Sequence, residues 1–159
     1  MVKIALNARV VRRAIVVLAI ALVLSQFVPL SHSNPPVTRE VRWDSAQTRV
    51  LTQRACFDCH SNVTTWPWYS RVTPSSFLVV SDVEDGRRRL NFSEWDKPQR
   101  ATIMDVEHDI QEGDMPAWQY LPMHRDAWLS PAEKSQLIEG LRKTFAADPP
   151  VPGPPLRRR

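Results

Sequence analysis

The chain has 159 residues, of which 43% are hydrophobic, enough for one modest domain with extensions. Lys and Arg outnumber Asp and Glu by 21 to 17, but the surplus lies at the N-terminus, in Lys3, Arg9, Arg12 and Arg13. From Asn34 onward the two classes of charge are balanced. Because no basic patch stands out within the domain, composition argues against a nucleic-acid-binding protein.

The first predicted element is an apolar leader over residues 1–31. Its basic N-terminal residues are followed by Ala14–Leu30, which contain no charge. This order is typical of a secretory signal or of a membrane anchor whose basic end stays in the cytoplasm. The apolar run is slightly short for a spanning helix of about 20 residues. However, Ser31-His32-Ser33 is a poor cleavage site, so we favour an uncleaved anchor over a cleaved signal. Both imply export of the domain that follows.

Proline marks both edges of that domain. Residues 32–37 read as a short stiff linker, since Pro35 and Pro36 favour extended backbone. Residues 148–159 form a proline-rich basic tail without an apolar period, which predicts an extended or disordered end. One domain over residues 38–147 lies between them.

Within the domain, the pattern predicts helices and almost no strand. Asp44 or Ser45 can cap a first helix that runs up to the cysteines. Thr73 and Pro74 suit the start of a second helix, with Gly86 near its end.

Two further helices follow along the chain. Asp96 and Pro98 are expected to open the third, and Gly113 to close it. Ser130 and Glu133 are in capping-box register for the fourth, with proline at its first position. Their buried faces are predicted at Ile103, Val106 and Ile110, and at Leu137, Ile138, Leu141 and Phe145. The domain is therefore expected to be all-α, with about four short helices.

Tryptophan is concentrated in the stretches between these helices. Such aromatic side chains either pack over a large bound group or cap a small core, and composition alone leaves both open. The residues concerned are Trp66, Trp68, Trp95, Trp118 and Trp128.

The stretch RACFDCHSN holds the only two cysteines, Cys56 and Cys59, followed directly by His60. C-x-x-C-H is the attachment signature of c-type haem. The two thiols can form thioethers to the porphyrin, and the adjoining imidazole can bind iron as the proximal ligand.

Three other interpretations of the two cysteines are weaker. A structural zinc needs four ligands, and the histidines elsewhere do not form a closely spaced second pair. A thioredoxin-like dithiol needs a strand–helix setting that the surrounding helical pattern does not offer. A plain disulfide would close a very small loop and add little stability. An exported dithiol redox protein therefore remains only the third hypothesis.

The sixth ligand is predicted to be Met115, in the sequence GDMPAW between two helices. Gly113 and Pro116 suit a loop that holds a thioether sulfur in one place, and such ligation favours electron transfer. His124, also in a loop, is the serious rival. Weaker candidates are Met123, Met104, which we expect to pack, and His108, which we expect on the solvent side of its helix.

Five motifs occur in the order CFDCHSN, TTWPWYS, LNFSEW, GDMPAWQYLPMH and LSPAEK. Together they resemble the small bacterial haem-binding domain family of monohaem c-type proteins, over Ala55 to Phe145. The resemblance implies a cytochrome-c-like helical fold with haem at Cys56, Cys59 and His60, and it supports Met115. The proline-rich tail is not a feature of that family.

These observations predict a periplasmic monohaem c-type cytochrome, tethered to the bacterial inner membrane, with one covalent haem c. It would pass single electrons between redox protein partners, with no substrate and no enzymatic activity. The alternative is a haem sensor or peroxidase-like protein whose sixth position is open or displaceable.

Overall fold

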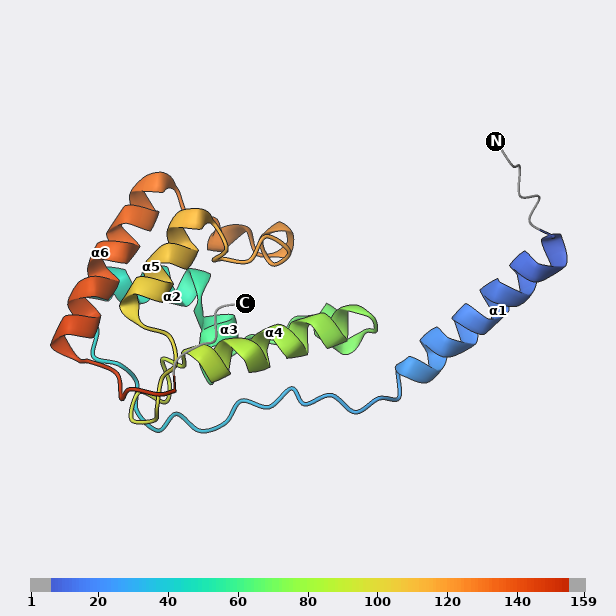
Figure 1. Ribbon diagram of the computed structural model, residues 1–159, viewed down its shortest axis with the longest axis horizontal. Helices are drawn as coiled ribbons and strands as arrows, with labels where there is room; N and C mark the ends of the chain where they lie inside the picture. The colour runs from blue at the N-terminus through green and yellow to red at the C-terminus, as the bar shows by residue number, and fades with distance from the viewer. Residues whose placement is uncertain (1–6, 155–159) are drawn as a thin grey trace. The chain divides into compact units, whose positions relative to one another are not determined.

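The computed structural model describes residues 7–154 of the chain. This described part contains six α-helices, three short 3-10 helices and no strand, only two isolated bridges (Figure 1). The predicted all-α class is therefore confirmed for these residues. The α-helices are α1 (Ala8–Ser25), α2 (Ala46–Ala55), α3 (Phe57–His60), α4 (Ser75–Arg89), α5 (Ile103–Glu112) and α6 (Pro131–Ala147). The 3-10 helices are η1 (Trp68–Arg71), η2 (Leu121–Met123) and η3 (Arg125–Ala127).

The chain divides into two compact units. The first combines Met1–His32 with Pro67–Ser81, and the second combines Ser33–Trp66 with Asp82–Arg159. Helix α4 contributes residues to both units. Residues 1–6 of the predicted leader and residues 155–159 of the predicted basic tail lie outside the described residues.

Helix α1 is the main element of the first unit. Asn7 caps it, because the Asn7 side chain accepts a hydrogen bond from the backbone N–H of Arg9 (2.9 Å). No residue of α1 is buried. Between residues 7 and 154, none of the helices combines the length and apolar character needed to span a bilayer. The membrane anchor stays a prediction.

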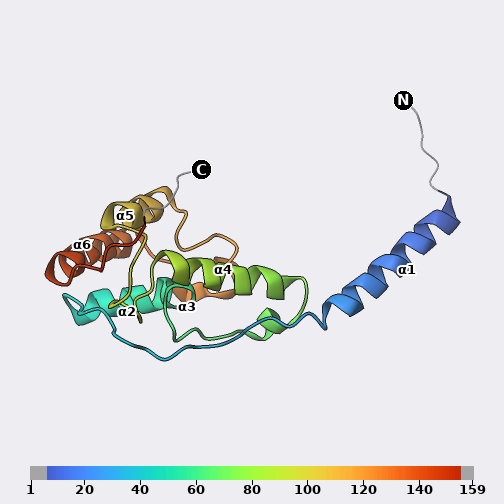
Figure 2. The same cartoon turned by 60° about the horizontal axis from the view of Figure 1, so that its bottom comes forward.

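The second unit is built around α2, α5 and α6, which lie close together in both views (Figures 1 and 2). At its centre, Trp95 is 0% exposed and stacks on Phe92, with its ring edge-on to Phe145. The indole N–H of Trp95 donates to the carbonyl of Asp148 (2.9 Å), so the polar end of this large side chain is also satisfied. The remaining core residues are Val41, Leu51, Phe57, Leu90, Ile110, Leu137 and Leu141.

Most predicted helix ends are confirmed. Ser45 caps α2 by accepting from the N–H of Thr48, and Ser130 with Glu133 forms the capping box of α6. Gly113 closes α5 in the left-handed region, at φ 84°, which glycine adopts without strain.

Gly86 lies near the end of α4, as predicted, and the helix ends three residues later at Arg89. One predicted boundary is wrong: α5 begins at Ile103, capped by Thr102, rather than at Asp96 or Pro98. The helix starts late because the residues before it make hydrogen bonds with other parts of the chain. The backbone N–H groups of residues 99–101 donate to the carbonyls of Val151 and Arg89, so this stretch is paired outside any helix.

The aromatic side chains of the connecting stretches divide into two groups. Of the five tryptophans predicted there, Trp95 belongs to the core, and Trp66 is half-buried. Trp68, Trp118 and Trp128 are all more than half exposed.

Candidate functional site

The C-x-x-C-H motif lies at a break between two helices. Helix α2 ends at Ala55, Cys56 leaves the helical region at φ −128°, and α3 then runs over the rest of the motif. The backbone N–H of His60 donates to the carbonyl of Cys56 (2.8 Å), which sets the two residues one helical turn apart. Both cysteines are free thiols. This short helix over the motif was not predicted from the sequence.

A cavity of about 60 Å³ brings three of the predicted site residues together: Cys56, His60 and Met115. Cys59 and His124 are not among its lining residues. Its apolar walls come from Ala55, Leu90, Phe92, Ala101, Val106, Ile110 and Leu141, and its polar ones from Arg89, Asp105 and Asp109.

The hydrogen bond of His60 determines which ring nitrogen can bind a metal. The Nδ1 atom lies 3.0 Å from the carbonyl oxygen of Leu90. Because a carbonyl can only accept, Nδ1 carries the proton and Nε2 keeps its lone pair. Burial lowers the pKa of His60, which favours the neutral ring. Metal-binding histidines typically donate their second N–H to a backbone carbonyl in this way.

The two thiols are poorly suited to redox chemistry of their own. Burial raises the pKa of both Cys56 and Cys59 to about 12, and at Cys59 the charges of Asp82 and Asp58 add to the effect. Both are therefore protonated thiols at neutral pH. A dithiol oxidoreductase needs the opposite, a lowered thiol pKa.

Gly86 allows α4 to pass closely over the motif. A Cβ atom at this position would lie only 2.9 Å from the carbonyl carbon of Cys59 and 3.0 Å from its Cβ. Gly86 was predicted only to lie near the helix end, and the structure adds this close approach within the helix.

The distal segment, residues 113–130, carries Met115 to the cavity. Gly113 turns the chain out of α5, and the backbone N–H of Met115 donates back to the carbonyl of Asp109 (3.0 Å). Pro116 is buried and Met115 is half-buried. The position of the methionine is thus set by backbone pairing to the preceding helix.

A side-chain contact joins the distal segment to the motif itself. The Tyr120 hydroxyl donates to Oδ2 of Asp58 (2.6 Å), the second residue between the cysteines. Burial and the charge of Asp58 raise the pKa of Tyr120, so it remains a donor. The His124 ring stacks on Tyr120 with 3.8 Å between centroids, and its Nδ1 lies 3.9 Å from the same carboxylate oxygen.

A second connection comes from Arg54, two residues before Cys56. Its guanidinium donates to the carbonyls of Asp126 (2.8 Å) and Trp128 (3.3 Å) and to the carboxylate of Glu133 (2.6 Å). Sequence reasoning missed both Arg54 and Asp58. Their only signal in the sequence was that they lie within two residues of a cysteine, because their partners lie more than 60 residues away.

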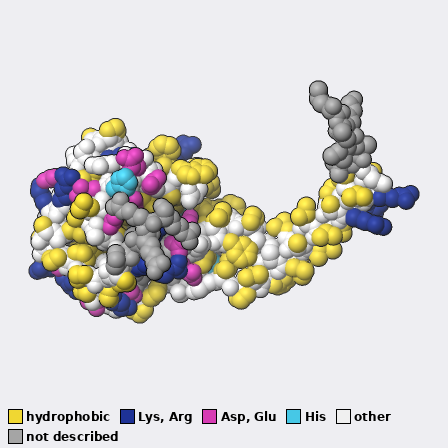
Figure 3. Space-filling view, viewed as in Figure 1, with side chains coloured by type: hydrophobic (Ala, Val, Ile, Leu, Met, Phe, Trp, Pro, Cys, Tyr) yellow, Lys and Arg dark blue, Asp and Glu magenta, His cyan; other side chains and the backbone are white. Residues whose placement is uncertain are grey.

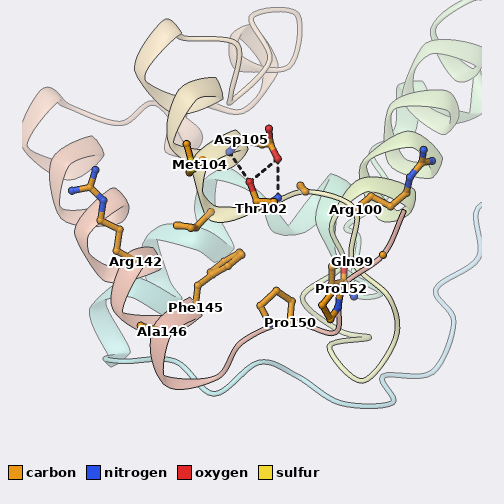
Figure 4. A pocket seen from close by; sticks show the side chains of 13 residues that line it. Gln99, Arg100, Thr102, Met104, Asp105, Arg142, Phe145, Ala146, Pro150 and Pro152 are labelled. Atoms are coloured by element: carbon orange, nitrogen blue, oxygen red, sulfur yellow. Dashed lines mark hydrogen bonds between the residues drawn. The ribbon is translucent and has the colours of Figure 1, made fainter. Parts of the chain in front are cut away.

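The remaining candidate ligands lie elsewhere. His108 is exposed, as predicted, and Met123 is exposed. Met104 was expected to pack, but it is 74% exposed and lies on a second, larger cavity of about 750 Å³ between α5, α6 and the C-terminal prolines (Figure 4). No residue of the C-x-x-C-H motif lines that cavity.

The donor set at the smaller cavity fits a c-type haem. It offers the half-buried Cys56 thiol, an imidazole whose Nδ1 is hydrogen-bonded to Leu90, a thioether and apolar walls, with the second thiol, Cys59, three residues along the chain. The volume of about 60 Å³ is smaller than the roughly 300–1,000 Å³ of ligand pockets, so the walls would lie farther apart around a bound macrocycle.

Comparison with known proteins supports haem binding by this chain. A family model described as a haem-binding domain matches residues 20–143. The matched range contains every residue that lines the smaller cavity. Neither the curated proteins nor the solved structures yielded a match.

Proposed function

Because this chain belongs to the haem-binding domain family, we propose that it is a monohaem c-type cytochrome that transfers single electrons between redox protein partners. In this proposal Cys56 and Cys59 hold one haem through thioethers, and the helices of the second unit form a cytochrome-c-like bundle around it. His60 is the proximal iron ligand and Met115 the distal one. The haem supplies the redox centre, with iron cycling between two oxidation states.

The observation that carries the proposal is the hydrogen bond from His60 Nδ1 to the carbonyl of Leu90 on the wall shared with Cys56 and Met115. It keeps the imidazole oriented and leaves Nε2 as the donor atom. It also increases the basicity of the ring as a ligand.

The distal segment supports the electron-transfer role over ligand binding or peroxidase chemistry. Tyr120 and Arg54 hold this segment against the motif, and Met115 lies on the cavity wall. A methionine held in this way would keep the sixth position filled and would raise the reduction potential. No substrate and no catalytic group are part of this proposal.

The proposal also assigns a location. The haem domain would face the periplasm, with the N-terminal helix tethering it to the bacterial inner membrane. Support comes from Arg9, Arg12 and Arg13 at the start of α1 and from the exposed apolar side chains that follow them.

The test is production of the full chain in a host that matures c-type cytochromes, followed by haem staining after denaturing electrophoresis. The wild-type band should stain, because only a covalent cofactor survives denaturation, and Cys56→Ser with Cys59→Ser should not. Folded protein without haem would overturn the proposal.

The oxidised spectrum of the same sample separates the two haem functions. A low-spin spectrum with the charge-transfer band of a methionine–ferric iron bond is expected for electron transfer. A high-spin spectrum would favour a sensor or peroxidase-like protein instead.

A further inference from the structure

The first compact unit, Met1–His32 with Pro67–Ser81, exposes an unusual amount of large hydrophobic surface. Phe27 is 79% exposed, Trp68 72% and Leu78 65%, and Phe77 is also exposed. Hydrophobic side chains continue along α1 (Figure 3). Exposed apolar surface of this extent marks a site of interaction with another molecule or with a membrane.

Hydrogen bonds join the two stretches of this unit into one piece. The backbone N–H of Thr73 donates to Oε1 of Gln26 (3.1 Å), and its hydroxyl donates to the carbonyl of Ser25 (3.2 Å). Within the second stretch, the Ser75 hydroxyl donates to the carbonyl of Tyr69 (2.8 Å), which holds η1 against the start of α4. Phe27, Trp68, Phe77 and Leu78 therefore belong to one local structure, named here the docking surface.

Charge is segregated between the two units. All 17 acidic residues of the chain fall in Ser33–Trp66 and Asp82–Arg159. Residues 1–32 and 67–81 carry only positive charge, from Lys3, Arg9, Arg12, Arg13 and Arg71. A surface that carries only positive charge suits an anionic lipid bilayer, because such a bilayer attracts Lys and Arg side chains next to the membrane.

We propose that the docking surface rests on an anionic lipid bilayer, with Trp68 at the level of the headgroups. Tryptophan is enriched at that depth because its ring is apolar and its N–H is polar. Phe77 and Leu78 would enter the acyl boundary, as the apolar side chains of interfacial helices do. The docking surface contains no residue of the haem site, so this proposal can be tested independently of the haem proposal.

The test is hydroxyl-radical footprinting of the full-length holoprotein, read by peptide mass spectrometry. The protein is labelled with and without vesicles of phosphatidylcholine containing one quarter phosphatidylglycerol. Trp68 oxidation should fall several-fold on these vesicles. Trp118, which is 78% exposed in the second unit, is the internal control and should keep its oxidation level.

A pair of double variants provides the second readout. Trp68→Gln with Leu78→Gln should lower co-flotation of the protein with the vesicles several-fold. If α1 alone keeps the variant on the vesicles, oxidation of Phe77 should instead return to its level without vesicles. The matched control, Val50→Gln with Met104→Gln, removes exposed apolar side chains of the second unit outside the distal segment and should change neither measurement.

Unchanged Trp68 oxidation on vesicles that carry the protein would overturn the proposal. Protection of Trp68 that requires an added protein, and is absent with lipid alone, would overturn it in favour of a protein interface. Haem staining is expected to be unaffected in every arm, which keeps this result separate from the test of haem attachment.

Discussion

The attachment motif and the distal segment face the same small cavity, yet they are built in opposite ways. From Arg54 to His60 the chain is nearly continuous helix, and the spacing of Cys56 and His60 follows from one helical turn. Residues 113–130 contain only two 3-10 helices of three residues each. Met115 is held by a local backbone bond to Asp109, but the rest of the segment is held by bonds to residues that are far away in the sequence.

The difference indicates where each half of the site is vulnerable. A substitution at a ligand residue of the motif removes that ligand directly, while local helical hydrogen bonds keep the backbone there in place. A change around the distal segment acts by loosening the contacts that hold it, so its effects on the site should be graded. The four predictions below test this contrast, beginning with the largest expected effect.

Replacement of His60 by alanine should cause the largest loss. We expect the covalent haem content to fall roughly tenfold or more. Even loss of a residue that only hydrogen-bonds a metal-binding histidine lowers metal affinity or activity by about 10–100-fold. Haem content of purified protein, measured against His108→Ala on the exposed face of α5, checks this. Equal loss in His124→Ala would break the contrast, because it would make the distal segment the source of the essential imidazole.

Met115→Ala should keep the covalent haem but alter the iron. The methionine charge-transfer band should disappear, and the reduction potential should fall by a fraction of the ~0.8 V range that axial ligands span. Redox titration followed by absorbance measures both, with Met123→Ala as the exposed control. An unchanged spectrum would instead assign the sixth position to His124.

Tyr120→Phe should loosen the distal segment without removing a ligand. A hydrogen bond to a charged group contributes about 1.5–3 kcal/mol, and because Asp58 is partly exposed we expect a loss near 1–2 kcal/mol in the free energy of unfolding. Urea denaturation of the holoprotein measures it. A double-mutant cycle with Asp58→Asn should show that the two effects are coupled. Strictly additive effects would mean that this contact does not hold the segment.

The smallest effect is expected at acid pH. The backbone N–H of Ser130, and then Arg54, lower the pKa of Glu133 to about 2. The ionised carboxylate therefore stabilises the fold fully above its unfolded pKa of about 4.3, and this contribution is lost as pH falls toward 2. Glu133→Gln should flatten the stability profile in that window, measured by thermal unfolding. Glu139→Gln, an exposed carboxylate paired with Lys143, should not.

Prediction from sequence succeeded where the signal was local. The cap at Ser45, the capping box at Ser130 and the glycine closure at Gly113 each depend on residues within one turn, and all three are confirmed. The predicted start of the third helix failed because distant chain segments pair with the residues before it. The third helix starts late because residues 99–101 pair with Val151 and Arg89.

The amino-acid sequence alone determined the all-α class, most helix caps and the C-x-x-C-H motif, because helical periodicity, capping and motif spacing involve residues only a few positions apart. Only the tertiary structure decided that His60 donates to Leu90, that Gly86 passes over Cys59, and that Met115 rather than His124 lines the cavity. These relations join residues about 25 to 60 positions apart. They exist only once the core has packed, so no local pattern can encode them.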